Sequence, residues 1–130
     1  MATDKIAAYL HLLEEAFEGR GLEQSNESQS LVWNLATVTH AEWTAVAPGA
    51  SRTIESMVRH VGACKVMYAD YAFSSGSKQW GTPEVEGPWQ VGAAPQNEAI
   101  EWLREAHRQL IAHVERLTDG DLERPRRTNW

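Results

Sequence analysis

The sequence predicts an all-α fold, a bundle built around three long helices. Apolar residues recur at steps of three and four in three stretches, near residues 4–18, 52–73 and 96–117. No run of alternating apolar and polar residues reaches the length of a strand. Because each helix must bury its apolar stripe against another element, the three stretches together predict a helical bundle.

The first long helix is expected near residues 4–18. Thr3 or Asp4 can cap its first turn, and Gly19 with Gly21 forms a typical stop. The predicted core stripe is Ile6, Leu10, Leu13 and Phe17, widened by Tyr9, Leu12 and Ala16. The polar stretch Leu22 to Ser30 is expected to be a loop.

Short elements are expected between the first two long helices. Residues 31–38 predict a short helix, and Thr39 with Glu42 forms a capping box for a single turn that ends near Trp43. A Pro/Gly connection then covers residues 45–50. About thirty residues therefore separate the two long helices, which fits a crossover connection in a bundle better than a tight hairpin.

The second long helix is expected to begin after Ser51, whose hydroxyl can cap its first turn. His60 falls inside or beside the apolar stripe of this helix. An imidazole in that position needs a hydrogen bond, a water or a metal as partner. The residues expected on the core face are Ile54, Met57, Val61, Cys64, Tyr68 and Tyr71, and those on the opposite face are Glu55, Arg59 and Asp70.

Residues 74–95 hold four glycines and three prolines and predict a long loop. Trp80 and Trp89 lie within it. Either both indoles pack on the bundle and hold the loop in place, or the loop is a lid over a pocket.

The third long helix, near residues 96–117, carries an apolar stripe that repeats every seven residues. His107 lies in that stripe and is expected to be an interior histidine with a partner. The stripe consists of Ile100, Leu103, His107, Leu110, Val114 and Leu117.

The composition of the chain argues against several classes of function. The chain has 130 residues and a net charge of −6, which predicts one domain and argues against a nucleic-acid surface. Its single cysteine suits a cytoplasmic protein. No apolar run predicts a signal peptide or a membrane span. The basic residues Arg124, Arg126 and Arg127 are expected to be solvated, and six tryptophans indicate large aromatic contacts.

Residues 35–60, LATVTHAEWTAVAPGASRTIESMVRH, resemble the DinB family. They match a leucine-ending helix, a T-x-x-E-W turn, a Pro/Gly loop and a helix start with a histidine about six residues later. The resemblance implies a four-helix bundle, often dimeric, and in many members a divalent metal held by three histidines. His60 takes the first ligand position. The other two ligands usually come from an H-x-x-x-H pair on the last helix, which this sequence lacks up to Trp130.

The resemblance therefore implies a DinB-like four-helix bundle over residues 1–130 whose fourth long helix lies beyond Trp130, or whose place a partner chain covers. Some members are thiol-dependent transferases or isomerases, using mycothiol or bacillithiol. The implied function is that of a cytoplasmic, homodimeric, metal-dependent thiol S-transferase or hydrolase-like enzyme. It would use Zn, Ni, Mn or Fe and act on a small molecule or a low-molecular-weight thiol. The alternative is a metal-free bundle that serves as a dimeric binding or interaction module.

Cys64 lies four residues after His60, on the same helix face. An H-x-x-x-C pair can supply two metal ligands, or a thiol activated by a neighbouring base. The other interpretation is a buried cysteine that acts as a small hydrophobic residue. His60 is expected to point into a cavity near residues 74–95 or near the Pro48 loop, at a depth that suits an interior site.

Overall fold

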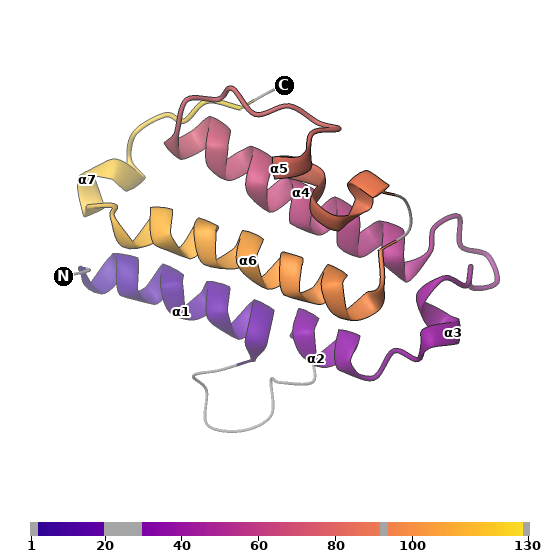
Figure 1. Ribbon diagram of the computed structural model, residues 1–130. Coiled ribbons are helices and arrows are strands. Elements are labelled where there is room, and N and C mark those ends of the chain that lie inside the picture. Colours follow the sequence, from indigo (N-terminus) through magenta and orange to yellow (C-terminus); the bar gives the residue numbers. More distant parts are fainter. Residues whose placement is uncertain (1–2, 20–29, 92–93, 129–130) are drawn as a thin grey trace. The chain divides into compact units, whose positions relative to one another are not determined.

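The computed structural model describes residues 3–19, 30–91 and 94–128. Within these ranges it contains only helices and one isolated bridge between Val46 and Thr53, which confirms the all-α fold. The elements are α1 (Asp4–Glu18), α2 (Leu31–Ala36), α3 (His40–Trp43), α4 (Ile54–Phe73), α5 (Pro83–Glu86), the 3-10 helix η2 (Gly87–Val91), α6 (Gln96–Glu115) and α7 (Asp119–Leu122) (Figure 1). Most of the loop expected at Leu22 to Ser30 lies outside the described residues. No helix in the described ranges is long and apolar enough to cross a membrane.

The chain divides into two compact units. The first unit comprises residues 1–38 and 111–124, and the second comprises residues 39–110 and 125–130. The helix α6 belongs to the second unit up to Leu110 and to the first unit from Ile111 onward.

The capping residues of α1, in the first unit, are those predicted from the sequence. The hydroxyl of Thr3 accepts a hydrogen bond from the backbone N–H of Ile6 at 3.4 Å. Gly19 adopts a left-handed conformation with φ 77°, and its N–H donates to the last carbonyls of α1. Ile6 and Phe17 are buried as predicted, whereas Tyr9 and Leu12, expected to widen the core stripe, are exposed.

In the second unit, α4 starts two residues later than predicted. Thr53, not Ser51, is the N-cap, and its hydroxyl accepts the N–H of Ser56 at 3.0 Å. The backbone bridge from Val46 to Thr53 holds residues 51–53 outside the helix, which explains the later start.

The predicted core face of α4 is wrong. Met57 and Tyr68, expected in the core, are exposed, and Asp70, expected outside, is buried. The buried face instead consists of Val58, Gly62, Ala63, Val66, Met67, Ala69 and Asp70. This face is rich in small residues, which allow close packing that a count of large apolar residues cannot detect.

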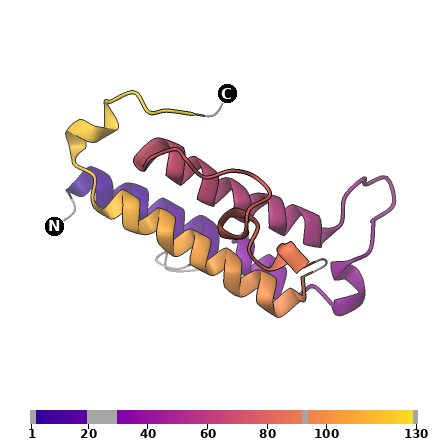
Figure 2. The ribbon, with the colours of Figure 1, turned by 45° about the horizontal axis from the view of Figure 1, so that its top comes forward.

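The core of the second unit forms around this small-residue face. Ala63, Val66 and Met67 from α4 pack with Val85 from α5 and Ala106 from α6. Both ribbon views show α5 lying over the middle of α4 (Figures 1 and 2). The sequence predicted only a loop over residues 74–95, so α5 and η2 correct that prediction.

Arg126 and Arg127, after α7, are exposed as expected, and they also contact the C-terminal end of α4. The guanidinium of Arg126 lies 5.4 Å from the Phe73 ring centre and donates to the carbonyl of Ala72 at 3.5 Å. Arg127 donates to the carbonyls of Ser74 and, at 3.3 Å, of Ser75. Cations are favourable at this end of a helix, where carbonyl groups lack helical partners.

Candidate functional site

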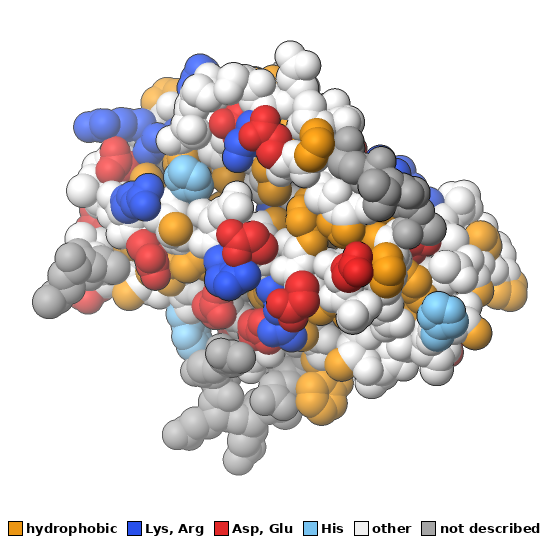
Figure 3. Space-filling view, in the orientation of Figure 1, with side chains coloured by type: hydrophobic (Ala, Val, Ile, Leu, Met, Phe, Trp, Pro, Cys, Tyr) orange, Lys and Arg blue, Asp and Glu red, His pale blue; other side chains and the backbone are white. Residues whose placement is uncertain are grey.

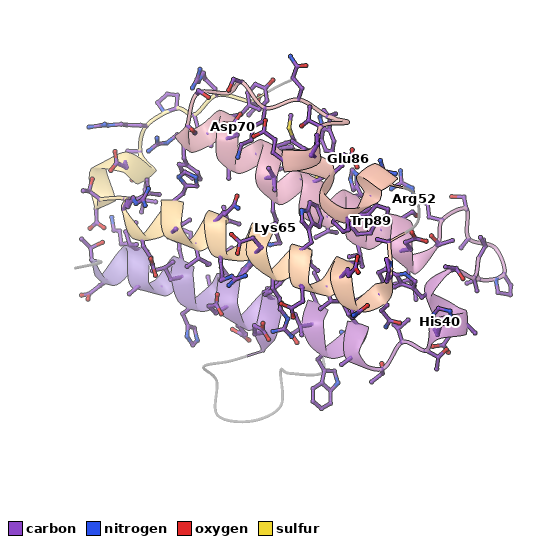
Figure 4. All side chains as sticks on the ribbon, in the orientation of Figure 1. His40, Arg52, Lys65, Asp70, Glu86 and Trp89 are labelled. Atoms are coloured by element: carbon purple, nitrogen blue, oxygen red, sulfur yellow. The ribbon has the colours of Figure 1, made fainter. Side chains whose placement is uncertain are left out.

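A cavity of about 430 Å³ lies in the second unit, beside the first half of α4. It is called the His60 pocket below. Its lining residues are Arg52, Ser56, Arg59, His60, Ala63, Trp80 and Glu86. They come from two stretches distant in sequence: residues 52–63, which include the first half of α4, and residues 80–86, which end in α5. Figure 4 labels one residue of each stretch, Arg52 and Glu86.

The charges in the pocket are two guanidinium groups and one carboxylate. The Nε of Arg59 donates to Oε2 of Glu86, whose side chain is 9% exposed. This ion pair compensates the burial of the Glu86 carboxylate. Arg52 has neither a hydrogen bond nor an ion pair within the described part of the chain. The pocket therefore presents one guanidinium whose charge is not neutralised by a neighbour.

His60 lies on the wall of this pocket, which agrees with a cavity near residues 74–95. Its side chain is exposed, so the expected interior depth is wrong. The imidazole is nearly parallel to the Trp80 indole, with an angle of 11° between the rings and 6.4 Å between their centres.

Cys64 and Tyr68 follow His60 at successive four-residue steps along α4. The Sγ of Cys64 lies 3.5 Å from Nε2 of His60 and 3.6 Å from the hydroxyl of Tyr68. Cys64 is half-buried, so it is not the fully buried hydrophobic residue of the simplest interpretation. The three side chains form a row in which the thiol contacts both neighbours.

The hydrogen bond with Cys64 raises the pKa of Tyr68 above its ordinary value of 10.0. Desolvation and the charge of Cys64 act in the same direction.

The segment that carries Trp80 is held at both ends. At its start, the buried carboxylate of Asp70 accepts the backbone N–H of Lys78 at 2.9 Å. At its end, Oε1 of Glu55 accepts both the indole N–H of Trp89 at 3.1 Å and the backbone N–H of Ala94 at 3.0 Å. Each pair ties this segment to α4.

The two tryptophans of residues 74–95 therefore differ in role. Trp89 is buried and meets Trp102 edge to face, with 5.5 Å between ring centres, so it packs the segment onto the unit. Trp80 is 44% exposed and lines the His60 pocket. The packing interpretation is confirmed for Trp89 and wrong for Trp80, and the lid over a pocket stays a prediction.

His107 is an interior histidine with a partner, as predicted. It is 3% exposed, and its Nδ1 lies 3.3 Å from the ammonium nitrogen of Lys65. It does not line the His60 pocket.

The sequence model of the DinB superfamily matches residues 22–130. The chain belongs to the DinB superfamily. No curated protein and no solved structure matches the sequence. The membership agrees with the resemblance of residues 35–60 and with the helical bundle.

In this DinB protein, the described residues do not form a metal site by themselves. His60 and Cys64 are close enough to share an ion, but no group of three histidine, cysteine or acidic side chains with suitable geometry occurs in residues 3–19, 30–91 and 94–128. A protein zinc site uses at least three such ligands. The described residues alone thus do not complete a metal site.

Sequence reasoning missed Arg52, Trp80 and Glu86 as members of one site. Arg52 and Glu86 are 34 positions apart, and no periodic pattern joins them. The available signal was a tryptophan in a Gly/Pro-rich segment, which pointed to Trp80 but gave it no partner.

Proposed function

We propose that this DinB protein binds a small molecule in the His60 pocket and acts on it in a thiol-dependent transfer or isomerisation. The observation that carries the proposal is the composition of the pocket wall. It combines an imidazole, two guanidinium groups, a carboxylate and an indole around about 430 Å³. Small-molecule sites have volumes of about 300 to 1,000 Å³ and a few convergent polar groups.

His60 is the proposed base of the reaction. An imidazole is the commonest general base in proteins, and this one is accessible from the cavity. It would accept the proton of an incoming thiol. The sulfur would then form its bond to the electrophilic carbon, and a leaving group would depart with the electron pair of the broken bond.

Metal dependence is a separate part of the proposal. By resemblance, His60 would be one ligand of Zn, Ni, Mn or Fe. The described residues supply no set of three ligands, so the step above uses the imidazole alone. Metal analysis of purified wild-type protein and His60→Ala tests this part: more bound metal in wild type supports His60 as a ligand, and equal content in both contradicts it.

The reaction is tested by the conjugation of 1-chloro-2,4-dinitrobenzene to glutathione, mycothiol or bacillithiol, which releases chloride. Assays run with and without added Zn²⁺, Ni²⁺, Mn²⁺ or Fe²⁺. His60→Ala should lower the rate about 100-fold or more, the usual contribution of a general base. His40→Ala, an exposed histidine outside the pocket, is the matched control and should retain the wild-type rate. No turnover with any thiol, or equal rates in both variants, would contradict the proposal.

A second candidate is a metal-free dimeric binding module. The observation that favours it is the exposure of Met57 and Tyr68, 46% and 42%, on α4. Exposed large apolar side chains that share a helix face are typical of interaction surfaces.

A further inference from the structure

The ring pair in the His60 pocket is loosely packed. The centres of the Trp80 and His60 rings are 6.4 Å apart, near the upper end of the 4.5–7 Å found for aromatic pairs. The two planes are nevertheless within 11° of parallel. Neither ring is buried, and Trp80 belongs to a turn rather than to a helix. A third flat group can therefore stack on the indole face at little cost in lost contacts.

The charge of the pocket indicates an anionic ligand. Arg59 is already paired with Glu86, but Arg52 has no partner within the described residues. A guanidinium presents parallel N–H donors that match the two oxygens of a carboxylate. Glu86 carries a negative charge on the same wall, which disfavours a second anionic group near Arg59.

We propose that the His60 pocket binds a flat aromatic monocarboxylate, which stacks on Trp80 and pairs its carboxylate with Arg52. The inference rests on the proposed function only in that both use this pocket. A cavity of about 430 Å³ accommodates a molecule of one or two rings. Stacking selects for flatness, and Arg52 selects for the negative charge.

Three probes with the same two-ring carbon skeleton separate the contribution of flatness from the contribution of charge. 2-Naphthoate is flat and charged, 2-naphthamide is flat and neutral, and decahydro-2-naphthoate is charged but not flat. Isothermal titration of the protein should show that 2-naphthoate binds about tenfold or more tightly than 2-naphthamide, since a charged hydrogen-bond pair contributes this much. It should also bind more tightly than decahydro-2-naphthoate, by up to about tenfold, because the saturated acid cannot stack on the indole. Benzoate serves as the one-ring probe.

Variants show which residue is responsible for the preference for a negative charge and which for the preference for a flat ring. Arg52→Gln should weaken 2-naphthoate about tenfold and leave 2-naphthamide unchanged. Trp80→Leu should remove the preference for the flat acid over the saturated acid. Arg108→Gln, an exposed arginine paired with Glu105 on α6, is the control and should bind as wild type. Circular dichroism spectra and melting temperatures check that each variant folds.

Three results would overturn the inference: no binding of either flat acid, equal affinity for acid and amide, or an Arg52→Gln variant that binds 2-naphthoate as wild type does. These results are distinct from failure of the proposed function. If conjugation depends on His60 but flat acids do not bind, only the proposed ligand class is contradicted. If flat acids bind but no conjugation occurs, only the proposed reaction is contradicted.

Discussion

At the residue scale, Gly62 decides how closely α4 can pack. A Cβ placed on Gly62 would meet three ring carbons of Trp102, the farthest at 2.9 Å. Gly87, with φ 53°, faces the pyrrole side of the same indole and leaves no room for a Cβ either. The Trp102 ring thus packs against two backbone positions that only glycine can occupy without a shift.

Gly62→Ala should destabilise the protein by about 1–3 kcal/mol, because the added methyl group overpacks the core against a rigid indole. Urea unfolding followed by circular dichroism gives the free energy of unfolding. Gly120→Ala in α7 is the matched control, since its Cβ would meet only the Thr118 hydroxyl at 3.8 Å. It should be neutral or stabilise by up to about 1 kcal/mol, as Ala does in helices. A Gly62→Ala protein as stable as wild type would contradict this view of the Trp102 contact.

Single residues of the pocket differ in how far the sequence could predict them. His60 was predicted because its position follows a family pattern and because it is an unusual residue in a helix stripe. Arg52 and Glu86 were not, because their roles depend on which segments meet in space. A charged residue before a helix or in a loop is ordinarily solvated. Only the fold shows that Arg52 and Glu86 instead line a pocket.

At the element scale, the helices that obey local rules were predicted well. The expected range of α1, residues 4–18, matches the observed helix, because a threonine cap, a regular stripe and a left-handed glycine mark it. The capping box of α3 also formed, with the carboxylate of Glu42 accepting the N–H of Thr39 at 2.8 Å. This hydrogen bond lowers the pKa of Glu42.

The orientation of α4 could not be predicted in the same way. The prediction relied on the periodicity of large apolar side chains, so Met57 and Tyr68 were expected in the core. The packed face uses glycine and alanine, because tertiary contacts with Trp102 and α5 need short side chains there. The helices α5 and η2 were also missed, since four- and five-residue helices in a Gly/Pro-rich segment carry too little periodicity.

The end of the segment at residues 74–95 depends on Glu55. Its Oε1 accepts two N–H groups, one from the buried Trp89 indole and one from the backbone of Ala94. The Ala94 carbonyl in turn accepts the indole N–H of buried Trp43 at 3.1 Å. Glu55→Ala would leave two donors without acceptors, at a cost of about 1–3 kcal/mol for a buried donor.

Glu55→Ala should therefore lower the stability by this amount and increase hydrogen exchange at Ala94. Exchange followed by mass spectrometry measures the second effect. Glu98→Ala is the control, because Glu98 is an exposed glutamate in the first turn of α6 and should leave Ala94 unchanged. Unaltered protection of Ala94 in Glu55→Ala would show that other contacts hold the segment.

At the scale of the whole molecule, the helical pattern predicted the all-α class correctly but did not reveal the site. Three long stripes sufficed for an all-α fold, since each helix signals itself locally. The net charge of −6 argued against nucleic acid. The face drawn in Figure 3 carries acidic and basic side chains interspersed, rather than one basic patch. A pocket formed by two distant stretches, residues 52–63 and 80–86, has no comparable local signal.

The chain is expected to form a homodimer through the exposed face of α4. Met57, Val61, Cys64 and Tyr68 recur at steps of four, three and four, so they share one helix face, and Met57 and Tyr68 are 46% and 42% exposed. Aromatic residues and methionine are enriched at protein interfaces, and this face carries both.

Light scattering at micromolar concentration should give twice the chain mass of 14.6 kDa. Tyr68→Glu should shift the mass to that of one chain, because it places a charge in the interface without disturbing the core. Ala41→Glu, at an exposed position of α3, is the control and should stay dimeric. A wild-type mass near 15 kDa, or a Tyr68→Glu variant that remains dimeric, would exclude this face as the dimer interface.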